Sequence, residues 1–169
     1  CFQAADSIAG TGTAEDRAYL YENIMQTEPG SELAYLLFAL LLQQQDTDEL
    51  IVDQALVEKL RPYLSKDDIF LSGIAGATSA EYVFRSDTEQ DLATLRRSLP
   101  LVLVRAVGGV EFYPQYARFS PLAEKSLRRI SGQDFGTKNR RAWVEWYTAN
   151  LDTFQLVRGR LELTPENQH

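Results

Sequence analysis

The sequence has one cysteine and one histidine in 169 residues, Cys1 and His169, and they stand at its two ends. A general base must be held within about 3 Å of the proton that it abstracts, and a terminal histidine is poorly placed for that. A single cysteine excludes an internal disulfide and, with one histidine, a zinc cluster of Cys and His ligands. The sequence therefore predicts no Ser-His or Cys-His nucleophile, no catalytic residue, no metal site and no cofactor.

Long apolar runs and an excess of basic charge are also missing. The longest apolar run, 33–42, is about half of the ~20 residues that span a bilayer, so we expect a core helix there. A formal charge of −7 and a pI of about 4.8 argue against a general nucleic-acid binder. The hydrophobic content of 44% excludes a disordered chain, and the length suits one domain.

The charge is unevenly distributed along the chain. Residues 1–68 hold 13 acidic and 4 basic side chains, a net charge of −9, and residues 69–169 hold 11 and 13, a net charge of +2. The sum is the total of −7. This distribution predicts an electrically polar molecule with an acidic N-terminal half.

Helical periodicity dominates the sequence, with turn residues between the periodic segments. Thr13 and Ser31 are expected as helix caps, and Gly73 and Gly76 are expected to allow a close helix crossing. The Val-Leu-Val run after Pro100 has strand propensity, but proline suits a first helical turn, so we expect a helix. The segment 152–163 is left open between a packed segment and one strand. The helices expected upstream are 14–27, 32–45, 49–60, 69–84, 89–98 and 101–107.

The stretch 122–147 has the clearest pattern in the chain. Its first half has a buried helical stripe and is followed by Gly132, which suits a left-handed C-terminal cap. Its second half places three rings on one face of a second helix: Trp143, Trp146 and Tyr147. Such rings are either ligand-stacking groups or core, and we expect core, filling the seam between the two helices.

The segment Ile-Ser-Gly-Gln-Asp-Phe-Gly at 130–136, followed by Ala-Trp at 142–143 and Trp-Tyr at 146–147, resembles the closing segment of bacterial HEAT-repeat proteins. Ser131 stands where that family has Thr, and Tyr147 where it has Trp. The resemblance implies a protein that works by contact and has no shared catalytic site. The predicted fold is all-α, with antiparallel helical pairs in a HEAT-like short solenoid or an irregular helical bundle.

Cys1 leads to an expectation about location. A mature chain that begins with cysteine is what signal peptidase II leaves on a bacterial lipoprotein, with the cysteine then acylated. The alternative is that the sequence merely happens to begin at this residue. We expect a lipid-anchored tether at 1–13, one helical domain at 14–163 and a polar tail at 164–169, on the periplasmic or extracytoplasmic face of a bacterial envelope membrane.

Two surfaces are predicted to bind a partner. The first is a basic cluster in which Arg140 and Arg141 open a helix, where positive charge is disfavoured. A solvated face is the alternative. The second is an aromatic segment around Pro114, which is either a partner-binding patch or an irregular connection. The residues proposed for binding are Arg128, Arg129, Arg140, Arg141, Phe112, Tyr113 and Tyr116.

The function expected from these features is that of a non-catalytic, membrane-tethered interaction or assembly subunit of an envelope protein complex. One alternative is an enzyme that acts on the cell envelope through a carboxylate, and a cleft with a buried, desolvated glutamate would favour it. Another alternative is a carrier of lipid or of another hydrophobic ligand, which needs an apolar cavity. A large exposed aromatic patch without such a cleft would favour the interaction subunit.

Overall fold

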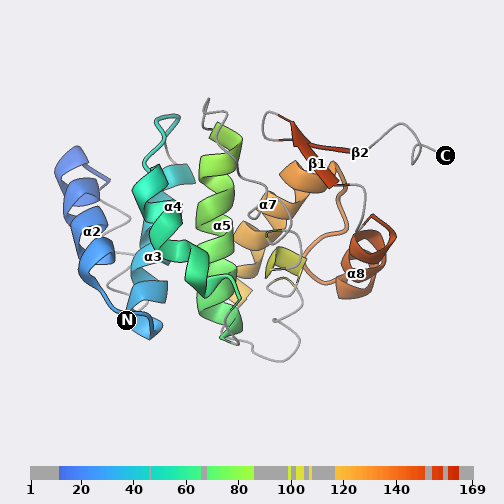
Figure 1. Cartoon of the computed structure of the whole chain (residues 1–169), viewed down its shortest axis with the longest axis horizontal. Helices are drawn as coiled ribbons and strands as arrows, with labels where there is room; N and C mark the ends of the chain where they lie inside the picture. The colour runs from blue at the N-terminus through green and yellow to red at the C-terminus, as the bar shows by residue number, and fades with distance from the viewer. Residues whose placement is uncertain are drawn as a thin grey trace.

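The helices stand side by side along the long axis, from α2 at one end to α8 at the other (Figure 1). The structure is a computed structural model, and it describes residues 12–45, 47–65, 68–85, 99, 102–104, 107, 117–150, 154–157 and 160–163. The elements are α2 (Ala14–Gln26), α3 (Ser31–Gln45), α4 (Gln54–Leu60), the 3-10 turn η1 (Arg61–Tyr63), α5 (Ile69–Arg85), α7 (Ser120–Ser131), α8 (Arg140–Ala149), β1 (Phe154–Val157) and β2 (Arg160–Leu163). The predicted all-α class is confirmed, because helices packed on helices form the body.

A small hairpin is the exception to this helical architecture. Strands β1 and β2 pair antiparallel, with Phe154 opposite Leu163. The sequence left 152–163 open between a packed segment and one strand, and the structure instead forms two short strands there. Strand β2 contacts α7, so the hairpin lies against the helical body.

The helix ends follow local sequence signals in part. Thr13 caps α2 as expected, and with Asp16 it forms a capping box. Ser31 was predicted as a cap, but it is the first residue of α3. The helix expected from residue 49 begins only at Gln54, so that prediction of its start is wrong. Asp53 caps it instead, accepting a hydrogen bond from the Leu56 N–H at 2.9 Å.

Gln44 explains the late start of α4. Its buried side chain donates a hydrogen bond to the Glu49 carbonyl at 2.8 Å and accepts one from the Ile51 N–H at 2.9 Å. These backbone groups are therefore bound to the end of α3 and do not join a helical ladder. The connection before Asp53 stays extended as a result.

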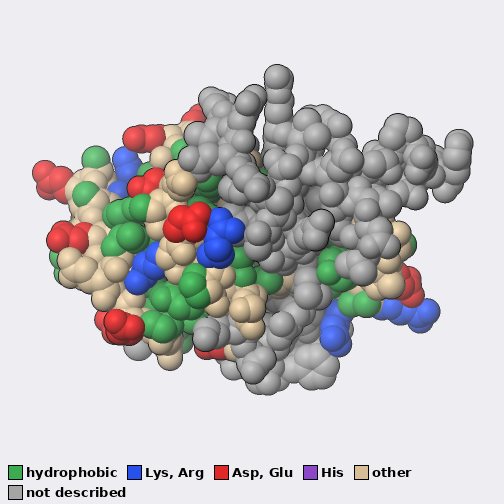
Figure 2. Space-filling view, viewed as in Figure 1, with side chains coloured by type: hydrophobic (Ala, Val, Ile, Leu, Met, Phe, Trp, Pro, Cys, Tyr) green, Lys and Arg blue, Asp and Glu red, His purple; other side chains and the backbone are tan. Residues whose placement is uncertain are grey.

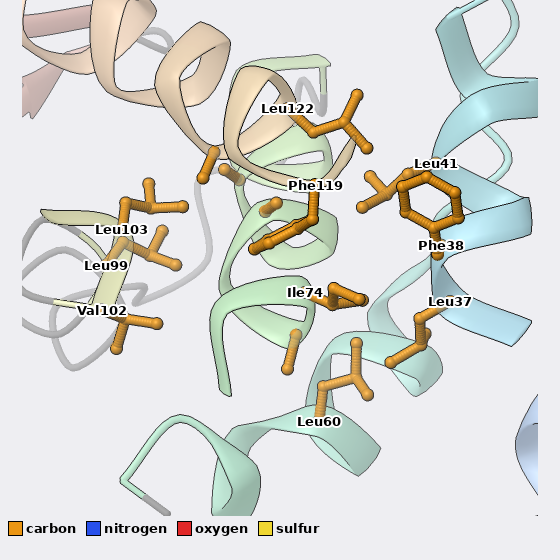
Figure 3. Close-up of a cluster of buried hydrophobic side chains, with 14 of the residues drawn as sticks. Leu37, Phe38, Leu41, Leu60, Ile74, Leu99, Val102, Leu103, Phe119 and Leu122 are labelled. Atoms are coloured by element: carbon orange, nitrogen blue, oxygen red, sulfur yellow. The ribbon is translucent and has the colours of Figure 1, made fainter. Parts of the chain in front are cut away.

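Helix α5 is the centre of the core. Every side chain from 71 to 83 is buried, and α5 contacts α3, α4 and α7. Figure 3 shows core side chains of α3, α4 and α7 on three sides of α5, with Leu99, Val102 and Leu103 on another. A Cβ added to Gly76 would lie 2.8 Å from Val102 Cγ1, so the predicted close approach at this glycine is confirmed.

The other predicted helices fall partly outside the described residues. Residues 102–104 and 107 are helical and buried, which confirms helix over strand for that part of 101–107. The helix expected at 89–98 lies outside the described residues. The apolar run 33–42 lies within α3, which contacts both α2 and α5. Of the helices that the structure describes, none is both long and apolar enough to cross a membrane.

The charge asymmetry of the sequence becomes an asymmetry in space. The N-terminal helices occupy one end of the row and α8 the other (Figure 1). Figure 2 shows several Asp and Glu side chains over the α2 end of this face, with some Lys and Arg among them, and Lys and Arg side chains beside an acidic one at the α8 end. In the described part of the chain, the acidic excess of residues 1–68 therefore lies toward the α2 end.

Candidate functional site: a charged groove on α7

An open groove of about 730 Å³ runs along α7 and the turn that follows it. Most of its lining residues are charged or polar by type, but apolar atoms make up the larger part of the lining surface. The lining residues are Gln45, Pro121, Leu122, Glu124, Lys125, Arg128, Arg129, Gly132, Gln133 and Asp134.

Gly132 shapes one end of this groove. It has φ of 68° and ψ of 6°, which is the left-handed C-terminal cap predicted for it, and its N–H donates to the Arg128 carbonyl at 2.9 Å. The turn brings Asp134 back beside α7, where its Oδ2 atom lies 3.4 Å from Arg128 Nη2. A carboxylate from outside the helix is thus added to the charges on α7.

Arg128 is shared between two carboxylates. Besides Asp134, its Nε atom lies 3.7 Å from Oε1 of Glu124, one helical turn earlier. Both separations exceed the about 2.7–2.9 Å of a charge-assisted hydrogen bond. Arg128 donates no hydrogen bond to any residue in the described part of the chain, and 52% of its side chain is exposed. The two carboxylates compensate the charge of Arg128, but its N–H groups donate no hydrogen bond within the described residues.

Glu124 lies in the groove wall and only 7% of its surface is exposed. Its Oε1 atom is buried and makes no hydrogen bond within the described residues. Burial raises the pKa of Glu124 above its usual range; the positive charge of Arg128 opposes that shift and the carboxylate of Asp134 adds to it. This is the buried, desolvated glutamate in a cleft that was expected to favour an enzyme.

Arg129 has a different role from Arg128. Its Nη1 atom donates to Oε1 of Glu81 on α5 at 2.8 Å, and only 7% of the Glu81 side chain is exposed. This pair links α5 to α7 across the buried face. Removing one partner of a buried pair leaves an uncompensated charge, so we assign Arg129 a mainly structural role.

Lys125 is the third cation of the groove. It lies one helical turn before Arg128 and Arg129 and is half-buried. No ion-pair or hydrogen-bond partner is found for its ammonium group among the residues that the structure describes. Lys125 and Arg128 are therefore the two groove cations whose donors are available to a ligand.

The four predicted arginines do not form one groove. Arg128 and Arg129 line it, whereas Arg140 and Arg141 lie exposed at the start of α8 and are not among its lining residues. Arg141 pairs with Glu145 at 2.7 Å, four residues later on the same helix. The prediction that basic residues open α8 is confirmed, but the structure places these two apart from the groove lining.

The aromatic predictions have mixed outcomes. Trp143 and Trp146 are buried, which confirms that these rings belong to the core. Phe119 is also buried and lies edge-on to Phe70 with ring centroids 6.0 Å apart. The other predicted site residues, Cys1, Phe112, Tyr113 and Tyr116, lie outside the described residues.

Sequence reasoning missed Glu124 as a site residue. A signal was present, because Glu124 lies one turn from Leu127 on the apolar stripe of α7, where a carboxylate is unexpected.

Within the described part of the chain, no group of three or more His, Cys, Asp or Glu side chains is arranged to hold a metal ion. Comparisons with family models, curated proteins and solved structures found no match for this chain.

Proposed function

We propose that this protein is a non-catalytic interaction subunit, tethered to a bacterial envelope membrane by acylated Cys1, whose α7 groove contacts a protein partner. The observation that carries the proposal is the pair Lys125 and Arg128. Both cations line an open groove, and neither donates a hydrogen bond to the residues that the structure describes. Unused charged donors at a concave surface are what a polar partner needs.

The architecture supports a role in contact. The body is a row of helices, which suits the HEAT-like pairing that the 130–147 segment suggests, and such rows offer extended surfaces for partners. We keep Arg140 and Arg141 in the proposed contact surface, because their cationic side chains are exposed at a helix start, where the helix dipole disfavours them.

The anchor is tested on the native protein. We expect the N-terminal peptide from native membranes to carry an excess mass of the size of a lipid, because acylation would modify Cys1. The Cys1→Ala variant is expected in the soluble fraction, with Ser7→Ala as a control that stays with the membrane. An unmodified peptide from native membranes would refute the anchor without bearing on the groove.

The contact surface is tested by charge reversal. Lys125→Glu with Arg128→Glu should weaken co-purification with the native complex, and the wild-type association should fall with salt as charges are screened. Arg140→Glu with Arg141→Glu tests the α8 residues separately. Arg61→Glu is the matched control, because Arg61 pairs locally with exposed Glu58 at 2.8 Å, remote from α7. Association that is unchanged in both double variants would contradict the proposal.

A second candidate is an enzyme that acts on cell-envelope material through Glu124. The observation that favours it is the burial of Glu124 in a groove wall beside Asp134, since a raised pKa suits a general acid. For an enzyme, the wild type should release soluble products from purified cell wall, and Glu124→Gln should abolish the release while Glu145→Gln does not. Absence of products from the wild type would eliminate this candidate.

A further inference from the structure

We infer that Lys125 and Arg128 form a carboxylate-binding site for an acidic peptide segment of the partner, with Glu124 and Asp134 acting as positioning residues for Arg128. The inference rests on the proposed function and narrows it. The carboxylate-binding site lies in the groove on α7. Arg129 is excluded from direct binding because its guanidinium is bound to buried Glu81.

Lys125 and Arg128 are placed to act on the same ligand. They are three residues apart on α7, so their side chains project from the same face of the helix. Both line the groove, and Arg128 keeps half of its side chain exposed. A group in the groove therefore meets an ammonium and a guanidinium from neighbouring positions.

The hydrogen bonding of Arg128 selects the ligand. A guanidinium offers a planar fork of N–H donors that matches the two oxygens of a carboxylate. Glu124 and Asp134 lie at 3.7 and 3.4 Å, which restrains the position of Arg128 but leaves its donors without hydrogen bonds in the described part of the chain. A ligand carboxylate at hydrogen-bonding distance can accept the hydrogen bonds from Arg128 that Glu124 and Asp134 do not accept.

The two resident acids also limit the ligand. Lys125 and Arg128 carry two positive charges, which Glu124 and Asp134 balance, so a dense anion is not favoured. Asp134 is 64% exposed at the edge of the groove and repels a sheet of anionic headgroups. A flat bilayer also does not enter a concave site of about 730 Å³, whereas a peptide segment can place its Asp or Glu side chains in it.

The test uses a fluorescently labelled peptide with blocked ends, in which two glutamates stand among neutral residues, and the full chain in detergent. We expect measurable binding by anisotropy that weakens with salt. Lys125→Gln and Arg128→Gln should each weaken the affinity by about tenfold, the size of one charged hydrogen bond. Arg61→Gln removes the same charge outside the groove lining, where Arg61 pairs with Glu58 at 2.8 Å, and should leave affinity within about twofold.

A competition experiment distinguishes a peptide ligand from a lipid headgroup. Vesicles of phosphatidylglycerol should not compete with the peptide. Effective competition that Arg128→Gln removes would overturn the peptide assignment in favour of a lipid headgroup. Absence of peptide binding, or an equal loss of affinity in Arg61→Gln, would also overturn it. Asp134→Asn tests positioning, because a loss of affinity despite the loss of a repelling charge is expected only if Asp134 orients Arg128.

The inference and the proposed function fail in different ways. If the native complex assembles equally well with the wild type and with the Lys125→Gln and Arg128→Gln variants, the subunit role stands and the carboxylate site is wrong. If the peptide binds as expected but the native protein is isolated without a partner, the site stands and the subunit role is wrong. Melting curves of each variant exclude loss of fold as the cause.

Discussion

Trp143 donates its indole N–H to the carbonyl oxygen of Gly136 at 2.8 Å. The ring is fully buried, and Phe135 lies against it edge-on with centroids 4.9 Å apart. The contacts of this indole are thus with the turn before α8, as well as with Trp146 one turn later at 6.0 Å. Trp143 fixes the turn to the helix that follows it.

Replacing this indole should be costly. We expect Trp143→Ala to lower the free energy of unfolding by about 3–5 kcal/mol, because a large buried ring is lost along with its hydrogen bond. Urea denaturation measures the change. Val144→Ala is the matched control, since Val144 is exposed on the same helix and should change stability by less than about 0.5 kcal/mol. Equal midpoints for both variants would show that the ring is not core.

Gly76 allows α5 to approach Val102 closely. Gly76→Ala should be destabilising by about 1–3 kcal/mol before an offset of about 1 kcal/mol from better helix propensity, because the new Cβ would meet Val102 Cγ1 at 2.8 Å. In a Val102→Ala background the same change should be neutral or stabilising. A double-mutant cycle measures this coupling, and additive effects of the two substitutions would contradict the close contact.

Lys59 supports the end of a helix distant in sequence. Its ammonium donates to the carbonyls of Met25 and Thr27 at 3.2 and 3.0 Å, where α2 ends. Lys59→Met should cost about 1–3 kcal/mol, since hydrogen bonds from a charged donor are lost. Hydrogen exchange in α2 should accelerate, whereas Lys59→Arg should preserve part of the protection. Unchanged exchange in the Met variant would mean that these bonds do not stabilise α2.

Glu124 should make stability depend on pH. Its folded-state pKa is raised, so between the unfolded value and that raised value the folded protein binds more protons. Stability is therefore higher below this window and falls as the pH rises through the folded pKa. Glu124→Gln should be more stable than wild type at neutral pH, and the advantage should vanish in acid below the usual carboxyl range. Glu145→Gln, which changes an exposed acid, should show no such gain.

Several features were predictable because they depend on neighbours in sequence. The capping box at Thr13, the left-handed Gly132 and the burial of Trp143 and Trp146 follow from spacings of three or four residues. Local patterns of this kind specify helix ends and helix faces without reference to the rest of the fold.

The features that were missed depend on contacts across the chain. The late start of α4 follows from the side chain of Gln44, which binds backbone groups up to seven residues later. Arg129 is neutralised by Glu81, 48 residues earlier, so it could not be separated from Arg128 by sequence alone. The burial of Glu124 depends partly on its place on the apolar stripe of α7, which the sequence shows, and partly on the elements that cover this stripe, which the sequence does not show.

Helix α5 is buried on all sides between residues 71 and 83. A fragment that keeps α5 but loses either flank would expose an apolar wall in the middle of the molecule, and a fragment without α5 would leave both flanks open. The chain is therefore unsuited to splitting into autonomous halves. A protease cut near α5 should release aggregating pieces instead of a stable subdomain, and mechanical or thermal stress should undo the helical body in a single step.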